Sequence, residues 1–209
     1  MSFLFLTLLP LLPLTAAQAE IPSRPTVDSM SMIGTGCPVG GAGIGTGAVN
    51  GTPIFSFPRW TLDLSSGEET DTEKYCIQKM QLANGPAGYQ VTVAALTVGG
   101  ISELEEGAVL GISVESTLGE EKAGAGSVQV LPSDILSNGT FSATVDISPE
   151  TWSECVTDDG VVPLISLRTT ISLSREEGVE DAKGTVGKVD GEIEDAVTVN
   201  FRAIWRECE

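Results

Sequence analysis

The residues that most suggest chemistry lie in a glycine-rich stretch near the N-terminus, where residues 34–47 read GTGCPVGGAGIGTG. A dinucleotide-binding loop needs G-x-G-x-x-G between a strand and a helix, and a P-loop needs Gly-Lys followed by Ser or Thr. Gly41 and Gly43 are followed by Thr46 where the third glycine would stand, and the stretch has no lysine. We therefore interpret it as a glycine-rich loop pinned by a disulfide, without a nucleotide site.

Cys37 within this stretch could be a nucleophile only if a base activated its thiol. The chain contains no histidine. This excludes Cys-His and Ser-His-Asp catalysis and every site that needs an imidazole ligand or proton shuttle. Zinc is a poor fit as well, because the four cysteines include no C-x-x-C pair.

Carboxylates are the remaining catalytic groups, either as a glycosidase pair or as a carboxyl-plus-amide peptidase. The acidic residues cluster in segments that resemble turns, namely 65–73, 102–107, 176–181 and 190–195. Such segments are typical of solvated loops, so no catalytic residue is predicted. A carboxylate-dependent hydrolase, glycosidase or glutamic-type peptidase, is kept as an alternative function.

Calcium is the metal that acidic loops of a secreted protein could bind. No EF-hand spacing is present, and TDDG at 157–160 could form a site only together with another loop. A metal site is therefore left open, with a calcium-dependent glycan-binding module as a further alternative and no other cofactor expected.

Aromatic rings on a surface would favour carbohydrate binding. The three tryptophans are expected mainly in the core, and Tyr75 and Tyr89 are the better candidates for exposure.

The first residues indicate the compartment of the protein, and the net charge limits its binding partners. Residues 1–19 form an apolar run ending in Ala17-Gln18-Ala19, which predicts a cleaved signal peptide and a mature start near Glu20. No later segment has the roughly 18 apolar residues that a membrane span needs.

The net charge of -18 disfavours binding to nucleic acid and to anionic lipid. We expect a secreted, extracellular protein whose partner is an unidentified protein or glycan.

The four cysteines, Cys37, Cys76, Cys155 and Cys208, predict two disulfides in a secreted chain. Three pairings are possible, and we favour Cys37 with Cys76 and Cys155 with Cys208. Each would close a loop of roughly 40 to 55 residues and add on the order of 3 to 4 kcal/mol of stability. Asn50 and Asn138 begin N-x-Thr sequons, which predict N-glycosylation in a eukaryotic secretory route. Asn138 is the better candidate because it lies in a predicted hairpin turn, although Asn-Gly is also the commonest dipeptide of a plain hairpin turn.

Short apolar and β-branched segments separated by turn residues predict an all-β fold, an antiparallel two-sheet sandwich of immunoglobulin-like or jelly-roll-like type. Helix should be limited to a turn or two. The expected strands are 54–64, 76–82, 90–97, 109–115, 127–131, 140–147, 162–173 and 196–205, with turns at 66–67, 84–86, 99–100, 138–139 and 159–160. Residues 20–33 are expected to be an extended lead, and residues 34–209 a single domain.

The clearest strand is the last one, AVTVNFRAIW, in which apolar and polar residues alternate. Val197, Val199, Phe201, Ala203 and Trp205 should face the core, with the residues between them turned toward water. A strand with one buried face and one solvent-exposed face is typical of an antiparallel sheet.

Four segments together resemble the family called domain of unknown function 4360: GTGCPVG, YCIQKMQLANGPAGYQ, TWSEC and IWREC. The family pattern falls here on Gly36, Cys37 and Pro38, on Cys76, Pro86, Gly88 and Tyr89, on Trp152, Ser153 and Cys155, and on Trp205 and Cys208. An Arg-Gly pair common in the family is replaced here by Val98-Gly99-Gly100.

The resemblance implies secretion, two disulfides and a β-rich fold, and it brings no activity with it. Among the taxa of the family, the sequons and the signal peptide favour a fungal source. The leading hypothesis is a secreted, non-catalytic, disulfide-stabilised interaction protein that acts at the cell surface or as an effector.

Overall fold

The computed structural model describes residues 25–37, 43–49, 52–57, 60–65, 72–148, 151–187 and 197–209, and for 43–49 and 52–56 it describes the backbone only. The signal-peptide prediction, the turn at 66–67 and the sequon at Asn50 lie outside the described residues. Within these ranges the chain is β-structure with one 3-10 turn, Pro132–Asp134. The strands are β1 (Thr26–Ile33), β2 (Gly43–Val49), β3 (Thr52–Phe57), β4 (Leu62–Leu64), β5 (Glu73–Ala83), β6 (Tyr89–Leu104), β7 (Ala108–Leu118), β8 (Glu121–Val130), β9 (Thr140–Asp146), β10 (Ile165–Arg175), β11 (Gly184–Val186) and β12 (Val197–Glu207).

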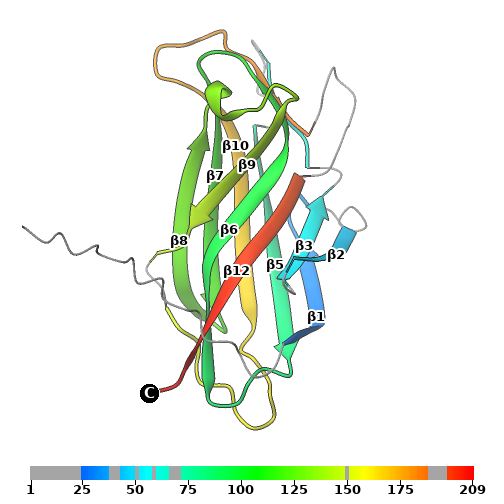
Figure 1. The fold of residues 1–209 in the computed structure, drawn as a ribbon. Coiled ribbons are helices and arrows are strands. Elements are labelled where there is room, and N and C mark those ends of the chain that lie inside the picture. Colours follow the sequence, from blue (N-terminus) through cyan, green and yellow to red (C-terminus); the bar gives the residue numbers. More distant parts are fainter. Residues whose placement is uncertain are drawn as a thin grey trace, which may run out of the picture.

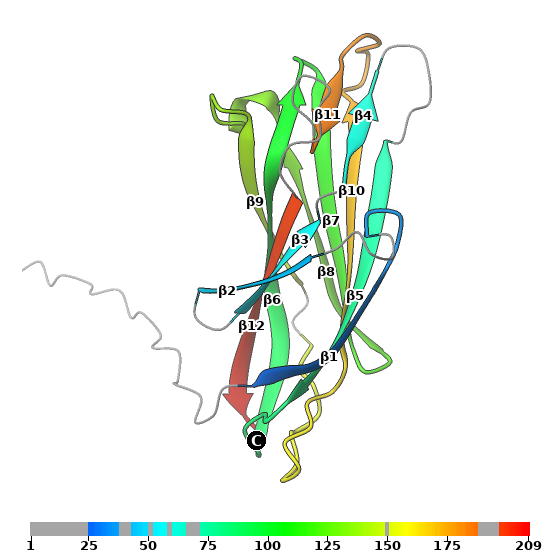
Figure 2. The same ribbon diagram turned by 90° about the vertical axis from the view of Figure 1, so that its right-hand side faces the viewer.

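These strands form two sheets packed face to face, which confirms the predicted all-β sandwich. The first sheet has the order β1-β5-β10-β7-β8, and the second has the order β2-β3-β12-β6-β11-β4, with β9 also paired to β6. All of these pairings are antiparallel. In Figure 1 the strands β9, β6 and β12 lie in front of β7, β10 and β5, and Figure 2 shows the two layers from the side.

The core between the sheets follows from alternation along the strands, because successive side chains point to opposite faces. In β10, Ile165, Leu167, Thr169, Ile171 and Leu173 are buried, while the residues that alternate with them are half-buried or exposed. The alternation predicted for the last strand is confirmed: Val197, Val199 and Phe201 are buried, and Ala203 and Trp205 pack against the core. Among the described residues, no helix is long and apolar enough to cross a membrane.

The predicted turn at Gly99-Gly100 is wrong, because both glycines lie inside β6, which runs unbroken for 16 residues. The strand pairs with β12 through Gly99 and with β9 through both glycines. A Cβ atom on Gly100 would lie 3.2 Å from the ring of Phe141 on β9. The absence of a side chain therefore serves close packing of β9 on β6, not a change of chain direction.

The N-terminal boundary also differs from the prediction. Residues 26–33 were expected to belong to a lead before the domain, but they form β1, the edge strand of the first sheet, paired with β5. The segment expected to be one strand over 54–64 contains two, β3 and β4, which lie in the same sheet with three strands between them. The short strand β11 was not predicted.

The two predicted disulfides are confirmed as Cys37–Cys76 and Cys155–Cys208. The glycines before Cys37 allow the first one to form. A Cβ atom on Gly34 would lie 2.2 Å from the carbonyl oxygen of Tyr75, and one on Gly36 would lie 2.6 Å from the ring of Trp60. Gly36 also donates its N–H to the Tyr75 carbonyl at 2.9 Å. Part of the glycine-rich stretch thus brings the backbone against β5.

The two disulfides differ in their access to solvent. Cys37 and Cys76 are buried, whereas Cys155 is exposed and Cys208 is half-buried. Because thiol–disulfide exchange requires a thiolate to reach a sulfur atom, we expect a mild reductant to open Cys155–Cys208 first in the folded protein. Peptide mass mapping after alkylation should find Cys155 and Cys208 labelled while Cys37 and Cys76 remain unlabelled. Equal labelling of all four cysteines before any loss of structure would contradict this, and a denatured sample serves as the control.

Candidate functional site

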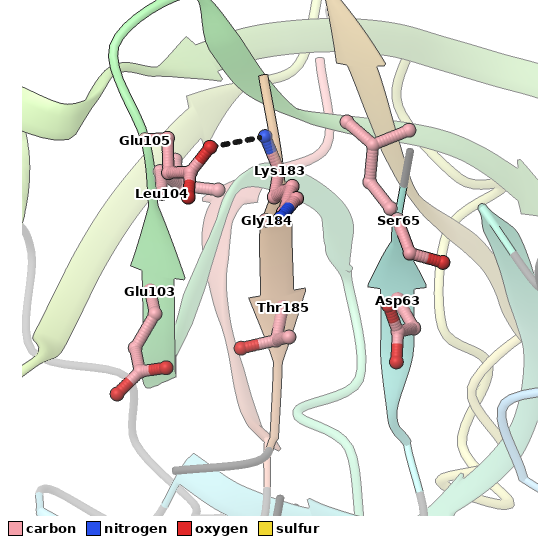
Figure 3. A pocket seen from close by; sticks show the side chains of 9 residues that line it. Asp63, Ser65, Glu103, Leu104, Glu105, Lys183, Gly184 and Thr185 are labelled. Carbon is pink, nitrogen blue, oxygen red and sulfur yellow. Dashed lines mark hydrogen bonds between the residues drawn. The ribbon is translucent and has the colours of Figure 1, made fainter. Parts of the chain in front are cut away.

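A shallow pocket lies where β4, β11 and β6 meet at one end of the second sheet. Its volume is about 330 Å³. It is lined by Asp63, Leu64, Ser65, Glu103, Leu104, Glu105, Lys183, Gly184 and Thr185. Polar groups of both charges therefore surround a small depression on the sheet, as Figure 3 shows.

Three side chains of this pocket form a row across neighbouring strands. Thr185 on β11 pairs with Asp63 on β4 and with Glu103 on β6. Their sequence neighbours Leu62, Leu64 and Val186 are buried, so the row points away from the core. Figure 3 shows Glu103, Thr185 and Asp63 side by side on the three strands.

Backbone and side-chain hydrogen bonds of Glu105, Lys183 and Arg175 hold the rim of the pocket. A carboxylate oxygen of Glu105 accepts the N–H of Lys183 at 3.0 Å, and the carbonyl of Lys183 accepts the N–H of Glu105 at 2.9 Å. Arg175, at the end of β10, donates from Nε to the carbonyl of Ala182 and from Nη2 to the carbonyl of Ser65, both at 2.9 Å. These bonds tie the loops around β4 and β11 to the first sheet.

The row of Asp63 and Glu103 is the arrangement closest to a hydrolase site in the described chain. Two strand spacings separate their backbones by roughly 9 to 10 Å. Inverting glycosidases place their carboxyl groups about 6.5 to 9.5 Å apart, with one of them in an apolar environment that keeps it protonated. Glu103 is exposed and Asp63 is half-buried on the outside of the sheet. The spacing therefore suits a carboxylate pair, whereas the surroundings do not suit a general acid.

A second polar surface lies further along the same side of β6. Strands β9, β6 and β12 align in register, with Ser142 beside Gly99 and Thr198, and Thr144 beside Thr97 and Asn200. We call the side chains Thr97, Ser142, Thr144, Thr198 and Asn200 the hydroxyl face. All five are exposed or half-buried, and the hydroxyls of Thr97 and Thr144 lie 3.0 Å apart. Its strands lie at the front of Figure 1.

Among the described side chains, the row next to the hydroxyl face on β9, β6 and β12 carries one charge of each sign. The next row pairs Asp146 with Ala95 and Ala95 with Arg202, so one carboxylate and one guanidinium border the face. Among the described residues, many of the acidic side chains lie in turns outside the strands, such as Glu105 and Glu106 after β6 and Glu176 and Glu177 after β10. The hydroxyl face is thus a neutral area on an acidic protein.

At its far end this surface carries an aromatic ring. The guanidinium of Arg206 lies 4.2 Å from the centre of the Trp152 ring, and its Nε donates to Oε1 of Gln90 at 3.0 Å. Trp152 is half-buried, although the sequence favoured a core position. The adjacent segment is held against β6, because Ser153 donates its N–H to the Val91 carbonyl and accepts the Val91 N–H on its side chain.

The tyrosines predicted to be exposed are both half-buried. Tyr75 has the guanidinium of Arg168 over its ring at 4.7 Å. Tyr89 donates its hydroxyl to Oε1 of Glu207 at 3.1 Å. That hydrogen bond, then loss of solvent contact and then the negative charge of Glu207, raise the pKa of Tyr89 above its ordinary value. Both rings act in side-chain pairs between neighbouring strands.

The segment TDDG, considered for calcium, forms a turn closed by its own side chains. Oδ1 of Asp159 accepts the Thr157 hydroxyl at 2.7 Å and the Val161 N–H at 3.1 Å, and Gly160 has a φ of 71°. Within the described ranges, no three Cys, Asp or Glu side chains gather in a way that could hold a metal ion. The calcium prediction therefore has no site built for it in this part of the chain.

Sequence reasoning missed both parts of this surface. The row Asp63–Thr185–Glu103 joins residues that are far apart in the chain, and β11 has only three residues, too few for a periodic signal. The hydroxyl face did leave a signal, since Ser142, Thr144 and Asp146 alternate with buried residues in β9. That alternation predicts a solvent-exposed face on β9, but it does not identify the neighbouring strands that complete the hydroxyl face.

The architecture and the two disulfides define a disulfide-stabilised β-sandwich with a polar outer sheet face. The chain belongs to the family described as domain of unknown function (DUF4360), whose model matches residues 23–208. The resemblance inferred from the cysteine and tryptophan motifs is thus confirmed. Among proteins with curated functions, none matches the sequence significantly.

Solved structures similar to this chain include three carbohydrate-binding modules. TmCBM61 in complex with β-1,4-galactotriose has 13% identity and a TM-score of 0.28, over 87% of this chain and 90% of that chain. CBM28, specific for non-crystalline cellulose, has 11% identity and a TM-score of 0.30, over 80% of each chain. The family 11 module from Clostridium thermocellum has 8% identity and a TM-score of 0.25, over 83% of this chain and 89% of that chain. At these TM-scores the likenesses carry no conclusion about what this chain binds.

The turn at 157–160 gives a prediction for pH. The hydroxyl of Thr157 and then the N–H of Val161 hold the pKa of Asp159 below its ordinary value. We expect Thr157→Ala to raise this pKa, which a carbon-detected NMR titration of the Asp159 carboxyl would measure, and Thr198→Ala on β12 to leave it unchanged. The stability that ionised Asp159 contributes is present above its unfolded-state pKa and is lost as the pH falls through its folded-state pKa. An unchanged Asp159 titration in Thr157→Ala would contradict the assigned cause.

Proposed function

We propose that this protein is a secreted, non-catalytic interaction protein that binds a neutral extracellular glycan on the hydroxyl face. One observation carries the proposal: on a chain with a net charge of -18, strands β9, β6 and β12 align five neutral polar side chains into one solvent-facing area. Secretion is supported by the apolar leader sequence and by two disulfides, which persist in oxidising compartments.

The chemistry of the face favours a glycan over a protein. Protein interfaces concentrate their binding energy in large aromatic and aliphatic side chains. The hydroxyl face has none, and its hydroxyl and amide groups can both donate and accept hydrogen bonds, as sugar hydroxyls do. Trp152 at the far end adds an aromatic ring of the kind that packs against an apolar sugar face. A negatively charged polymer would be repelled by the acidic loops around the face.

Binding is tested by placing a charge in the centre of the face. Thr144→Glu and Asn200→Glu put a carboxylate where the glycan would lie, so we expect each to weaken retention on insoluble cell-wall polysaccharide by at least about tenfold, or 1.4 kcal/mol. The matched control is Ser127→Glu, an exposed position on β8 of the other sheet. Equal retention of all variants would exclude the hydroxyl face. If the polysaccharide retains neither the wild type nor any variant, and a purified extracellular protein binds instead, a glycan partner would be excluded.

The alternative function is a carboxylate hydrolase centred on Asp63 and Glu103, and only their cross-strand spacing favours it. We expect no turnover on panels of glycans and peptides. If turnover is found, Asp63→Asn and Glu103→Gln should each abolish it, and Glu73→Gln on β5 should not. That result would replace the non-catalytic proposal.

We also propose that Asn138 carries an N-linked glycan when the protein passes through a eukaryotic secretory route. Asn138 is exposed in the turn before β9, next to Gly139 with a φ of 79°, and its Oδ1 accepts the hydroxyl of Thr140 at 2.7 Å. The sequon is therefore presented at the surface of a loop. Expression in such a host should give a mass increase that an amidase specific for N-glycans removes.

The sequon variants separate this modification from folding. Asn138→Gln and Thr140→Ala should lose the added mass of this site, whereas Thr140→Ser should keep it. A Thr140→Ala protein with the full added mass would contradict glycosylation at Asn138.

A further inference from the structure

Two groups stand out among the buried polar side chains of the described chain. Ser102, Ser116 and Ser153 donate their hydroxyls to backbone carbonyls of Thr185, Gly124 and Glu154. By contrast, Nε2 and Oε1 of Gln78, Oγ1 of Thr169 and Nε1 of Trp60 are buried and have no hydrogen-bond partner within the part of the chain that the structure describes. Buried polar groups in native proteins are almost always paired with protein atoms or ordered water.

Two members of the second group, Gln78 and Thr169, lie beside Cys76, and the third, Trp60, lies beside the residue that precedes Cys37. Thr169 on β10 is the register partner of Cys76, and Gln78 lies two residues further along β5 on the same inward face. Trp60 packs against Gly36, the neighbour of Cys37. Gln78 and Thr169 are both 0% exposed and Trp60 is 1% exposed, so bulk solvent does not satisfy them.

The positions of Gln78 and Thr169 suit a bridging molecule. Because Cys76 pairs with Thr169 and Gln78 pairs with Leu167, Gln78 and Thr169 are diagonal neighbours on adjacent strands. Diagonal neighbours have Cβ atoms roughly 7 Å apart. The carboxamide supplies two donors and an acceptor, and the hydroxyl supplies both, which gives a water molecule the two to four partners that it needs.

We infer an internal hydration site beside the Cys37–Cys76 disulfide, in which ordered water bridges the Gln78 carboxamide and the Thr169 hydroxyl, with the Trp60 N–H as a further donor. An apolar ligand does not fit, since it would leave these groups unpaired. A charged ligand does not fit either, because Lys, Arg, Asp and Glu are absent from the buried residues that the structure describes. The site binds water because water alone needs no counter-charge and little space.

The inference is tested first by a pair of substitutions on β10. Thr169→Val keeps the shape of the side chain and removes the hydroxyl that would bind water. Thr170→Val makes the same change at the next residue, which is half-buried on the outer face. If water bridges Gln78 and Thr169, Thr169→Val should lower Tm by roughly 2 to 4 °C relative to Thr170→Val. If the hydroxyl is buried without a partner, its removal should leave Tm unchanged or raise it, which overturns the inference.

The second measurement detects the water directly in the folded protein. NMR cross-relaxation between water and the side-chain amide protons of Gln78 should show a long-lived contact, which weakens in Thr169→Val. Contacts from this amide to a protein acceptor, with no contact to water, would show that a segment of the chain satisfies Gln78 and would overturn the hydration site.

Discussion

The architecture depends on the pairing of one long strand, β6, with its neighbours. Its 16 residues hydrogen-bond with β12, β9 and β11, and β11 in turn holds β4. A register shift opposite Arg202 and Ala203 inserts Ala94 as an extra residue, and the inward face is kept on both sides of this bulge. From Leu96 to Glu103 the buried residues of β6 alternate with outward-facing ones, so this part of the strand fixes the buried side of the second sheet and its outer surface together.

The outer side of β6 carries three separate groups of polar side chains. Near one end of the strand, Glu103 lies in the row with Thr185 and Asp63. In the middle, Thr97 belongs to the hydroxyl face. Near the other end, Gln90 accepts a hydrogen bond from Arg206, whose guanidinium lies over the Trp152 ring. The disulfide Cys155–Cys208 joins the segment that carries Trp152 to the end of β12. The proposed binding surface thus depends on the same pairings that stabilise the fold.

The sequence predicted most of the fold because its signals are local. Alternation in the last strand, the even cysteine count and the turn at Asn138-Gly139 each need only a few residues to be read, and the structure agrees with them. The turn predicted at Gly99-Gly100 is wrong because the reason for these glycines is not local. Locally the pair is typical of a turn, and only its packing against Phe141 on β9 shows why glycine is needed inside a strand.

The candidate site could not be predicted from the sequence, because its residues are not neighbours in the chain. Its residues come from β4, β6, β9, β11 and β12, and only the order of strands in the sheet brings them together. The edge strand β1 was placed outside the domain because its residues, TVDSMSMI, lack a regular apolar alternation, and its pairing with β5 compensates for that weak local preference.

The central claim is that the outer face of the second sheet is where this protein meets its partner. Hydrogen–deuterium exchange, measured by mass spectrometry with and without neutral cell-wall polysaccharide, tests it most directly. The account predicts slower exchange in peptides covering β9, the middle of β6 and β12, with the five-stranded sheet unchanged. Protection confined to β1, β5, β10, β7 and β8 would contradict the claim.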